Sequence, residues 1–127
     1  MTSPRNASLH HALGLALTRL QQTEPALAEL RQAAELEPDR ARYAYVYAVA
    51  LHSSGRHSEA LALLKKTLTA HPDDHDILMA LTSFSREAGD ATSALSYATL
   101  LQQLAPDPEL ERLIEGLRRL RTTTRHR

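Results

Sequence analysis

The sequence predicts an all-α fold, a right-handed α-α superhelix of three helix-turn-helix units with one further helix after them. Pro38, Pro72 and Pro106 stand 34 residues apart, and small and apolar residues recur in the same phase before each of them. The apolar fraction of 43% is carried by Leu and Ala, with one Phe and no Trp, which is a helical composition. Because a single repeat cannot bury its own apolar face, neighbouring repeats must share a core and leave a broad outer surface for binding.

The three units are expected at residues 7–40, 41–74 and 75–107. Each holds two helices, since its apolar residues recur at spacings of three, four and seven and so fall on one helical face. Two antiparallel helices approach closely only where the side chains at their crossing are small. The sequence supplies such residues at Gly14, Ala26, Ala48, Ala60 and Ala94.

Turn and capping residues agree with this division. Gly55 and Gly89 fall between the two helices of units two and three, where a positive φ is easiest for glycine, and Gln21-Gln22 stand there in unit one. Side chains expected to cap the first turn of a helix are Thr23, Ser58 and Asp90 for the second helices and Asp39 and Asp73 for the first helices.

Residues 108–121 predict a capping helix, with Asp107 as its N-cap and Pro108 at its first position. A repeat stack leaves its last apolar face uncovered, and a final helix that is polar on one side only would cover it. The remaining segments are expected to be a flexible N-terminus at 1–6 and a disordered tail at 122–127. The apolar stripe of the capping helix is Leu110, Leu113, Ile114, Leu117 and Leu120.

The residues at these positions give the chain its family resemblance. From Ala7 to Pro108 it resembles tetratricopeptide repeat proteins, with three units and a C-terminal solvating helix. A weaker resemblance links Ala41 to His52 with a repeat in the C-terminal tails of bacterial multihaem cytochrome proteins. The resemblance implies a non-catalytic module that binds a peptide or partner protein, or alternatively an assembly or regulatory domain cut from a larger bacterial protein.

In this family the first helix of each unit lines a concave groove, which implies a set of groove residues here. Tyr45 and Met79 are the expected apolar anchors for a bound peptide, and Arg42 and Arg86 the expected charge contacts. The alternative is that these are surface residues of a short stack without a dedicated ligand. The full set of candidates is His11, Leu15, Arg19, Arg42, Tyr45, Val49, His52, Asp76, Met79, Ser83 and Arg86.

Two other binding modes can be compared with this groove, a carboxylate clamp and self-association. Chaperone-binding members hold a C-terminal carboxylate with a clamp of Lys, Asn and Arg, and this chain is not expected to do so, because its residues at those positions offer no such set. Those residues are His11, Leu15, Val46, Asp76 and Ala80.

Self-association as a homodimer is the rival to partner binding, because Leu9, Leu13 and Leu20 would form an apolar end face.

No metal, cofactor or catalytic site is expected. The chain has no Cys, and the histidines and carboxylates between His71 and Asp76 lie at a repeat junction, where Pro and Asp are ordinary. No phosphate-binding glycine loop or Ser/His/Asp arrangement is present, which argues against an enzyme.

Nucleic acid and membrane partners are not expected either. The 15 basic and 15 acidic residues cancel, and the arginines near the C-terminus lack interleaved aromatic residues for base stacking. Those arginines are Arg112, Arg118, Arg119, Arg121, Arg125 and Arg127. No apolar run approaches the ~20 residues needed to cross a bilayer. A complete chain is expected in the cytoplasm, and a fragment of an exported protein in the periplasm.

Overall fold

The computed structural model describes residues 6–125, with side chains up to Thr122. Every regular element in this range is an α-helix, which confirms the predicted all-α class. The expected flexible start at 1–6 lies, apart from Asn6, outside the described residues. The helices belong to two compact units, Met1–Ala70 and His71–Arg127.

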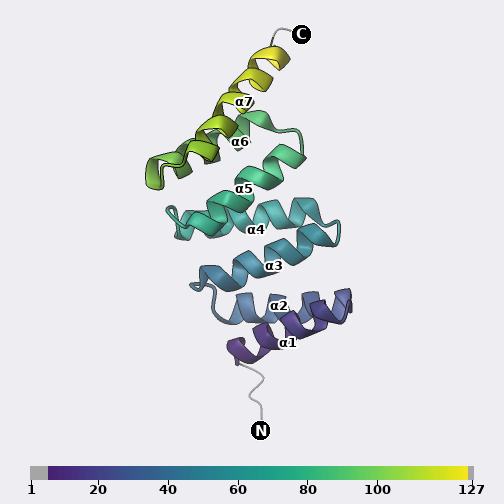
Figure 1. The fold of residues 1–127 in the computed structure, drawn as a ribbon. Helices are drawn as coiled ribbons and strands as arrows, with labels where there is room; N and C mark the ends of the chain where they lie inside the picture. The colour runs from purple at the N-terminus through teal and green to yellow at the C-terminus, as the bar shows by residue number, and fades with distance from the viewer. Residues whose placement is uncertain (1–5, 126–127) are drawn as a thin grey trace. The chain divides into compact units, whose positions relative to one another are not determined.

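The first unit is a succession of four antiparallel helices, drawn from purple to teal in Figure 1. Each helix packs against the next one in the chain, so that α2 lies between α1 and α3 and α3 lies between α2 and α4. Apolar residues from consecutive helices therefore share one core. The helices are α1 (Ala7–Arg19), α2 (Thr23–Leu36), α3 (Ala41–Ser53) and α4 (His57–Ala70).

The second unit holds α5 (His75–Glu87), α6 (Ala91–Leu104) and α7 (Pro108–Arg125), with α6 packed against both of the others (Figure 1). The final helix continues to Arg125 instead of ending at 121, so that residues 122–125 are helical and only 126–127 of the expected tail lie outside the described residues. Of its predicted stripe, Leu110, Ile114 and Leu117 are buried, whereas Leu120 is 60% exposed.

The small residues expected at helix crossings are buried, and Gly14 shows why they must be small. A Cβ added at Gly14 on α1 would lie 2.6 Å from both Cγ and Cδ2 of Leu30 and 3.2 Å from the Leu30 backbone nitrogen. The two helices therefore meet with no room for a methyl group. The other four positions, Ala26, Ala48, Ala60 and Ala94, are almost or completely shielded from solvent.

The turn within each helix pair has one residue with a positive φ, always at the same place in the turn. Gly55 and Gly89 have φ of 87° and 79°, as the sequence predicts, and Gln21 takes φ of 60° at the corresponding place in the first pair. A non-glycine residue in this region is uncommon, because its Cβ crowds the backbone. Gln21 thus adopts the positive φ of the repeated turn, although a non-glycine residue prefers a negative φ.

Helix capping follows the sequence prediction in part. Asp90 accepts a hydrogen bond from the Ser93 backbone nitrogen at 3.0 Å, and Asp107 accepts one from the Glu109 backbone nitrogen at 2.8 Å, as expected. The predicted caps Thr23 and Ser58 are wrong, because they lie inside α2 and α4.

The predicted caps Asp39 and Asp73 are also wrong, each by one residue. The N-caps are Arg40, without a side-chain hydrogen bond, and Asp74, which accepts from the Ile77 backbone nitrogen. The Arg40 and Asp74 backbone nitrogens bond to carbonyls three residues earlier, so Pro-Asp occupies the centre of a turn and the helix starts one residue later. Sequence reasoning missed Asn6, which caps α1 by accepting from the Leu9 nitrogen.

Candidate functional site

An apolar pocket of about 290 Å³ lies within the first unit, between α1 and α3, and is here named the α1–α3 pocket. Its volume is at the lower end of the ~300–1,000 Å³ typical of ligand pockets, which suits one or two side chains better than a large ligand. Its lining is Leu15 and Thr18 from α1; Thr23, Ala26, Leu27 and Leu30 from α2; Tyr45, Val46, Val49, Ala50 and Ser53 from α3; and Ser54.

Helical spacing explains how three helices contribute to one pocket. On α3, Val46, Val49 and Ala50 follow one another at intervals of three and one, so they share a face. The floor comes from α2, where Ala26, Leu27 and Leu30 are buried core residues. Sequence reasoning missed these floor residues, because a buried core position and a pocket floor have the same apolar pattern.

Two of the hydroxyl groups on the pocket wall are engaged by backbone carbonyls. Thr18 Oγ1 donates to Gly14 O at 2.9 Å, and Ser54 Oγ donates to Ala50 O and Leu51 O at 2.9 and 3.0 Å. These are local bonds that helical Ser and Thr side chains make with the preceding turn. The pocket consequently presents mainly carbon atoms to a ligand, and apolar contact is the chemistry it can offer.

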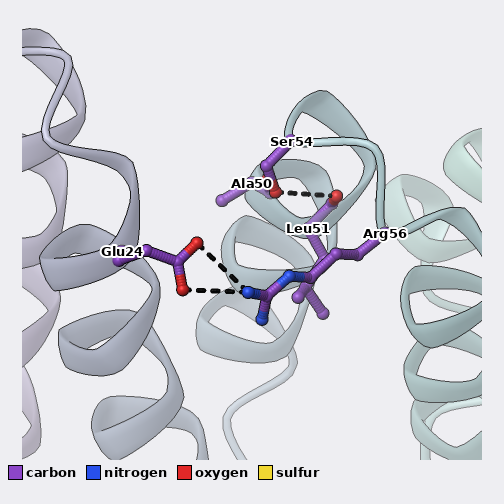
Figure 2. A network of polar contacts seen from close by, with 5 residues as sticks. All are labelled: Glu24, Ala50, Leu51, Ser54 and Arg56. Carbon is purple, nitrogen blue, oxygen red and sulfur yellow. Dashed lines mark hydrogen bonds and ion pairs between the residues drawn. The ribbon is translucent and has the colours of Figure 1, made fainter.

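An ion pair joins two segments that contribute residues to the pocket. Figure 2 shows the Arg56 guanidinium reaching the carboxylate of Glu24, with Nη2 at 2.9 and 3.1 Å from the two oxygens. Glu24 follows Thr23 at the start of α2, and Arg56 lies in the turn after Ser54. Thr23 and Ser54 both line the pocket, whereas Glu24 and Arg56 themselves do not.

A second cation lies beside the pocket. The Arg42 guanidinium carbon is 5.7 Å from the centre of the Tyr45 ring, one turn earlier on α3, and Tyr45 lines the pocket. This distance is within the range of a cation–π contact. An aromatic wall with a positive charge over it favours an apolar group that has an acidic neighbour.

His11 packs next to the pocket without lining it. Its ring centre is 4.6 Å from that of Tyr43, and its Nδ1 is buried without a hydrogen-bond partner among the described residues. Burial lowers the pKa of His11, and the positive charge of Arg42 lowers it further. The Arg40 guanidinium carbon is 5.1 Å from the centre of the same Tyr43 ring, so that the ring contacts one cationic side chain as well as His11. The ring contact joins α1 to α3, and the lowered pKa of His11 disfavours the charged form of its imidazole there.

The remaining groove candidates of the first unit lie elsewhere. Arg19 is exposed at the end of α1 and does not line the pocket. His52 makes an edge-to-face ring contact with His57 at 4.4 Å between ring centres. Of the seven candidates in this unit, the structure therefore brings Leu15, Tyr45 and Val49 into one pocket, with Arg42 beside it.

The candidates of the second unit form a separate set. Asp76 and Met79 are exposed on α5. Ser83 and Arg86 line a shallow hollow of about 620 Å³ together with residues of α7. The whole lining of that hollow is Ser83, Arg86, Glu87, Gly89, Ala91, Leu117 and Leu120.

The described residues also bear on metal binding and on membrane crossing. Among residues 6–125, no three His, Asp or Glu side chains lie close enough together to hold a metal ion, and this includes the stretch from His71 to Asp76. None of the described helices combines the length and apolar character that a membrane crossing requires.

The helix pairs and the pocket between first helices define a helical-repeat protein. Family models described as tetratricopeptide repeat match residues 11–75 and 51–117. The chain therefore belongs to the tetratricopeptide repeat family, as its sequence resemblance indicates. No curated protein matches this sequence.

Solved structures share the fold. A MamA double mutant from Desulfovibrio magneticus RS-1 is 19% identical, with a TM-score of 0.81, and the match covers 92% of this chain and 66% of that one. YrrB, titled a tetratricopeptide repeat protein with an unusual peptide-binding site, is 22% identical with a TM-score of 0.75, covering 87% and 57%. The Yersinia enterocolitica secretion chaperone SycD, solved with a peptide of the translocator YopD, is 15% identical with a TM-score of 0.70, covering 89% and 87%. The chain thus spans less than two thirds of the length of MamA and YrrB.

Proposed function

We propose that this chain is a non-catalytic protein-binding module whose α1–α3 pocket receives an apolar side chain of a partner peptide. The observation that carries the proposal is the pocket itself, which is open to solvent, lined mainly by carbon and has the Arg42 guanidinium over its Tyr45 ring. Tetratricopeptide repeats are in general interaction modules, and the printed titles of SycD and YrrB both name a peptide or a peptide site. These findings support a protein partner.

The Arg42 charge beside the pocket indicates what flanks the anchoring side chain. Arg42 stands over Tyr45, and the carboxylate of Glu24 is already engaged by Arg56. The charged group that lies over the aromatic wall is therefore cationic, which favours an acidic residue next to the apolar anchor. We infer a peptide with one aliphatic or aromatic residue and an acidic residue close to it in sequence.

The test uses a synthetic peptide selected on the wild-type chain from a random displayed library. Its affinity is then measured by fluorescence anisotropy on Val49→Asp, which places a charge in the pocket, and on Val49→Phe, which fills the pocket without a charge. Each variant should weaken binding by about tenfold or more, because a truncated or blocked anchor pocket removes a central contact.

The matched control is Ala62→Asp, which adds the same charge at an exposed position on α4. It should leave the affinity unchanged, and melting curves of all three variants identify any that fail to fold. Undiminished binding to a folded Val49→Phe variant would exclude the α1–α3 pocket as the peptide site.

Self-association is a second candidate function, favoured by the outer surface of α1. Leu9, Leu13 and Leu20 are 37%, 43% and 66% exposed, and α1 carries no Asp, Glu, Lys or Arg before Arg19. An uncharged apolar helix face can pack against a second copy of itself. Sedimentation equilibrium over a range of concentrations should then show a dimer that Leu13→Glu dissociates. A wild-type chain that stays monomeric at all concentrations would remove this candidate.

A further inference from the structure

Another pocket lies within the His71–Arg127 unit, between α6 and α7, and is here named the α6–α7 pocket. Its volume is about 490 Å³, and no function is assigned to it above. Two arginines of α7 and three hydroxyl groups of α6 line it together with two leucines. The lining residues are Thr92, Leu95, Ser96, Thr99, Leu100, Arg118 and Arg121.

The arginines of this pocket have no acidic partner among the residues that the structure describes. Among the described residues, neither Arg118 nor Arg121 forms an ion pair, although Glu115 lies one turn before Arg118 on α7. In addition, Arg121 Nε is buried and makes no hydrogen bond to any described residue. Buried polar groups almost always have a partner, so this guanidinium calls for an acceptor that the described residues do not supply.

The two positive charges also destabilise each other when the pocket is empty. Arg118 and Arg121 are three residues apart on one helix, where like charges repel. A favourable interaction with the C-terminal end of the helix dipole accounts for arginines near the end of α7, but it does not explain a pocket lined by two of them. A dianion between them would turn this repulsion into attraction on both sides.

The hydroxyl groups facing the arginines complete a set of donors. Thr99 Oγ1 donates to the Leu95 carbonyl at 2.7 Å, whereas the hydroxyls of Thr92 and Ser96 make no hydrogen bond to another described residue. The lining contains no Asp or Glu that would repel an anion. Two guanidinium forks and two available hydroxyls, with no acidic group, suit a tetrahedral oxyanion of charge −2 better than a single carboxylate.

We propose that the α6–α7 pocket binds a phosphate group, either as inorganic phosphate or as the phosphorylated Ser or Thr side chain of another protein. The apolar side chains of Leu95 and Leu100 lie beside the donors and would contact the carbon atoms that carry a phosphomonoester. RNA is the less suitable ligand, because the pocket has no aromatic side chain on which a base could stack.

The test follows the side-chain Nε resonances of Arg118 and Arg121 by NMR in the full chain. Inorganic phosphate is titrated against sodium chloride at matched ionic strength, and it should give saturable shifts that chloride does not give. Arg118→Gln and Arg121→Gln should each weaken phosphate binding by about tenfold or more, since each removes charge-assisted hydrogen bonds. Arg121→Lys keeps the charge but loses the planar fork, and should fall between wild type and Arg121→Gln.

Arg112→Gln is the matched control, because Arg112 lies on the same helix but pairs with Glu109 at 2.7 Å and does not line the pocket. This variant should bind phosphate as the wild type does. A peptide with phosphoserine, compared with the same peptide carrying serine, then distinguishes the two sources. Tighter binding of the phosphopeptide than of inorganic phosphate assigns the pocket to a partner protein, and equal binding assigns it to the free ion.

Three results would overturn the proposal. The first is a phosphate response no larger than that of chloride, and the second is binding that persists in both folded Arg→Gln variants. The third is a short single-stranded RNA that binds through Arg118 and Arg121 more tightly than either phosphate probe. Melting curves show whether each variant is folded. If Arg121→Gln does not fold, phosphate binding by Arg121→Lys tests the same side chain independently.

Discussion

Arg56 joins two helix pairs of the first unit through its ion pair with Glu24, 32 residues earlier in the chain. The two side chains are 41% and 72% exposed, so water and salt compete strongly with the pair. We therefore expect the pair to contribute little to the stability of the fold.

A double-mutant cycle with Glu24→Gln and Arg56→Gln tests this weak coupling. The coupling free energy of unfolding should be at most about 1 kcal/mol at low salt, because exposed ion pairs contribute little. It should decrease in 1 M sodium chloride, where the Debye length is about 3 Å. Urea unfolding at both salt concentrations measures it. A coupling well above that value, or one that salt does not change, would show a desolvated pair.

Gly14→Ala tests the close approach of α1 and α2. The added methyl group would collide with Leu30 Cγ and the Leu30 backbone, so overpacking should destabilise the fold by about 1–3 kcal/mol. The gain in helix propensity of about 1 kcal/mol offsets only part of this. The free energy of unfolding in urea gives the net effect.

Gly116→Ala is the control for that substitution. A Cβ at Gly116 in α7 would meet nothing within 4 Å, so only the propensity gain remains. This variant should be more stable than wild type by up to about 1 kcal/mol. If Gly14→Ala and Gly116→Ala change stability equally, the α1–α2 contact at Leu30 is not as close as described.

Ala60→Leu tests the crossing of α3 and α4. Ala60 is fully buried, and three additional carbon atoms there must displace neighbours in a close-packed core. We expect a loss of about 1–3 kcal/mol in the free energy of unfolding. Ala62→Leu adds the same atoms at an exposed position two residues later on α4 and should change stability little. An unchanged melting temperature for Ala60→Leu would contradict the assigned helix phase.

His11 gives the first unit a pH dependence of known sign. Its pKa in the folded chain is lowered by burial and by Arg42 from an unfolded value of about 6.5. The unfolded chain therefore binds the proton more readily, and stability decreases as pH falls from about 6.5 towards the lowered folded pKa. His10 next to it pairs with Glu29 at 2.6 Å, so the contribution of His11 must be isolated by mutation.

The comparison that isolates it is wild type against His11→Gln in urea unfolding between pH 5 and pH 8. The wild type should lose more stability on acidification than the variant, because only the wild type gains a proton at this position on unfolding. The two curves should run parallel above about pH 7, where His11 is neutral in both states. Parallel curves over the whole range would show that His11 does not have a lowered pKa.

Much of the fold could be predicted from local sequence signals. The proline period and the buried small residues define the helix pairs, and Gly55 and Gly89 take the positive φ that their turns require. Gln21 adopts the same conformation without a glycine, because the packing of the helices on either side determines the turn. The caps at Asp39 and Asp73 were misplaced by one residue, since a Pro-Asp turn and a Pro-Asp helix start have the same residues and differ only in their hydrogen bonds.

The sites were less predictable. Leu15, Tyr45 and Val49 were expected on an inner surface, and they line the α1–α3 pocket. The α2 residues on its floor have the same apolar sequence pattern as core residues. Whether such a residue borders a pocket depends on the side chains packed around it, which the sequence pattern does not show. The assignment of the full groove set stays a prediction, as do the bacterial origin and the resemblance of residues 41–52 to cytochrome tails. The α6–α7 pocket depends on hydroxyls and arginines about 25 residues apart, a juxtaposition that only tertiary packing creates.

The most direct test of the central claim is methyl NMR of the chain with labelled Leu and Val, before and after addition of the selected peptide. The account predicts the largest shifts at Leu15, Leu27, Val46 and Val49, which line the α1–α3 pocket. It predicts small shifts at Leu110 and Leu117 in the second unit. Shifts concentrated on Leu9 and Leu13 of α1, or on the second unit, with none at the pocket, would contradict the proposed peptide site.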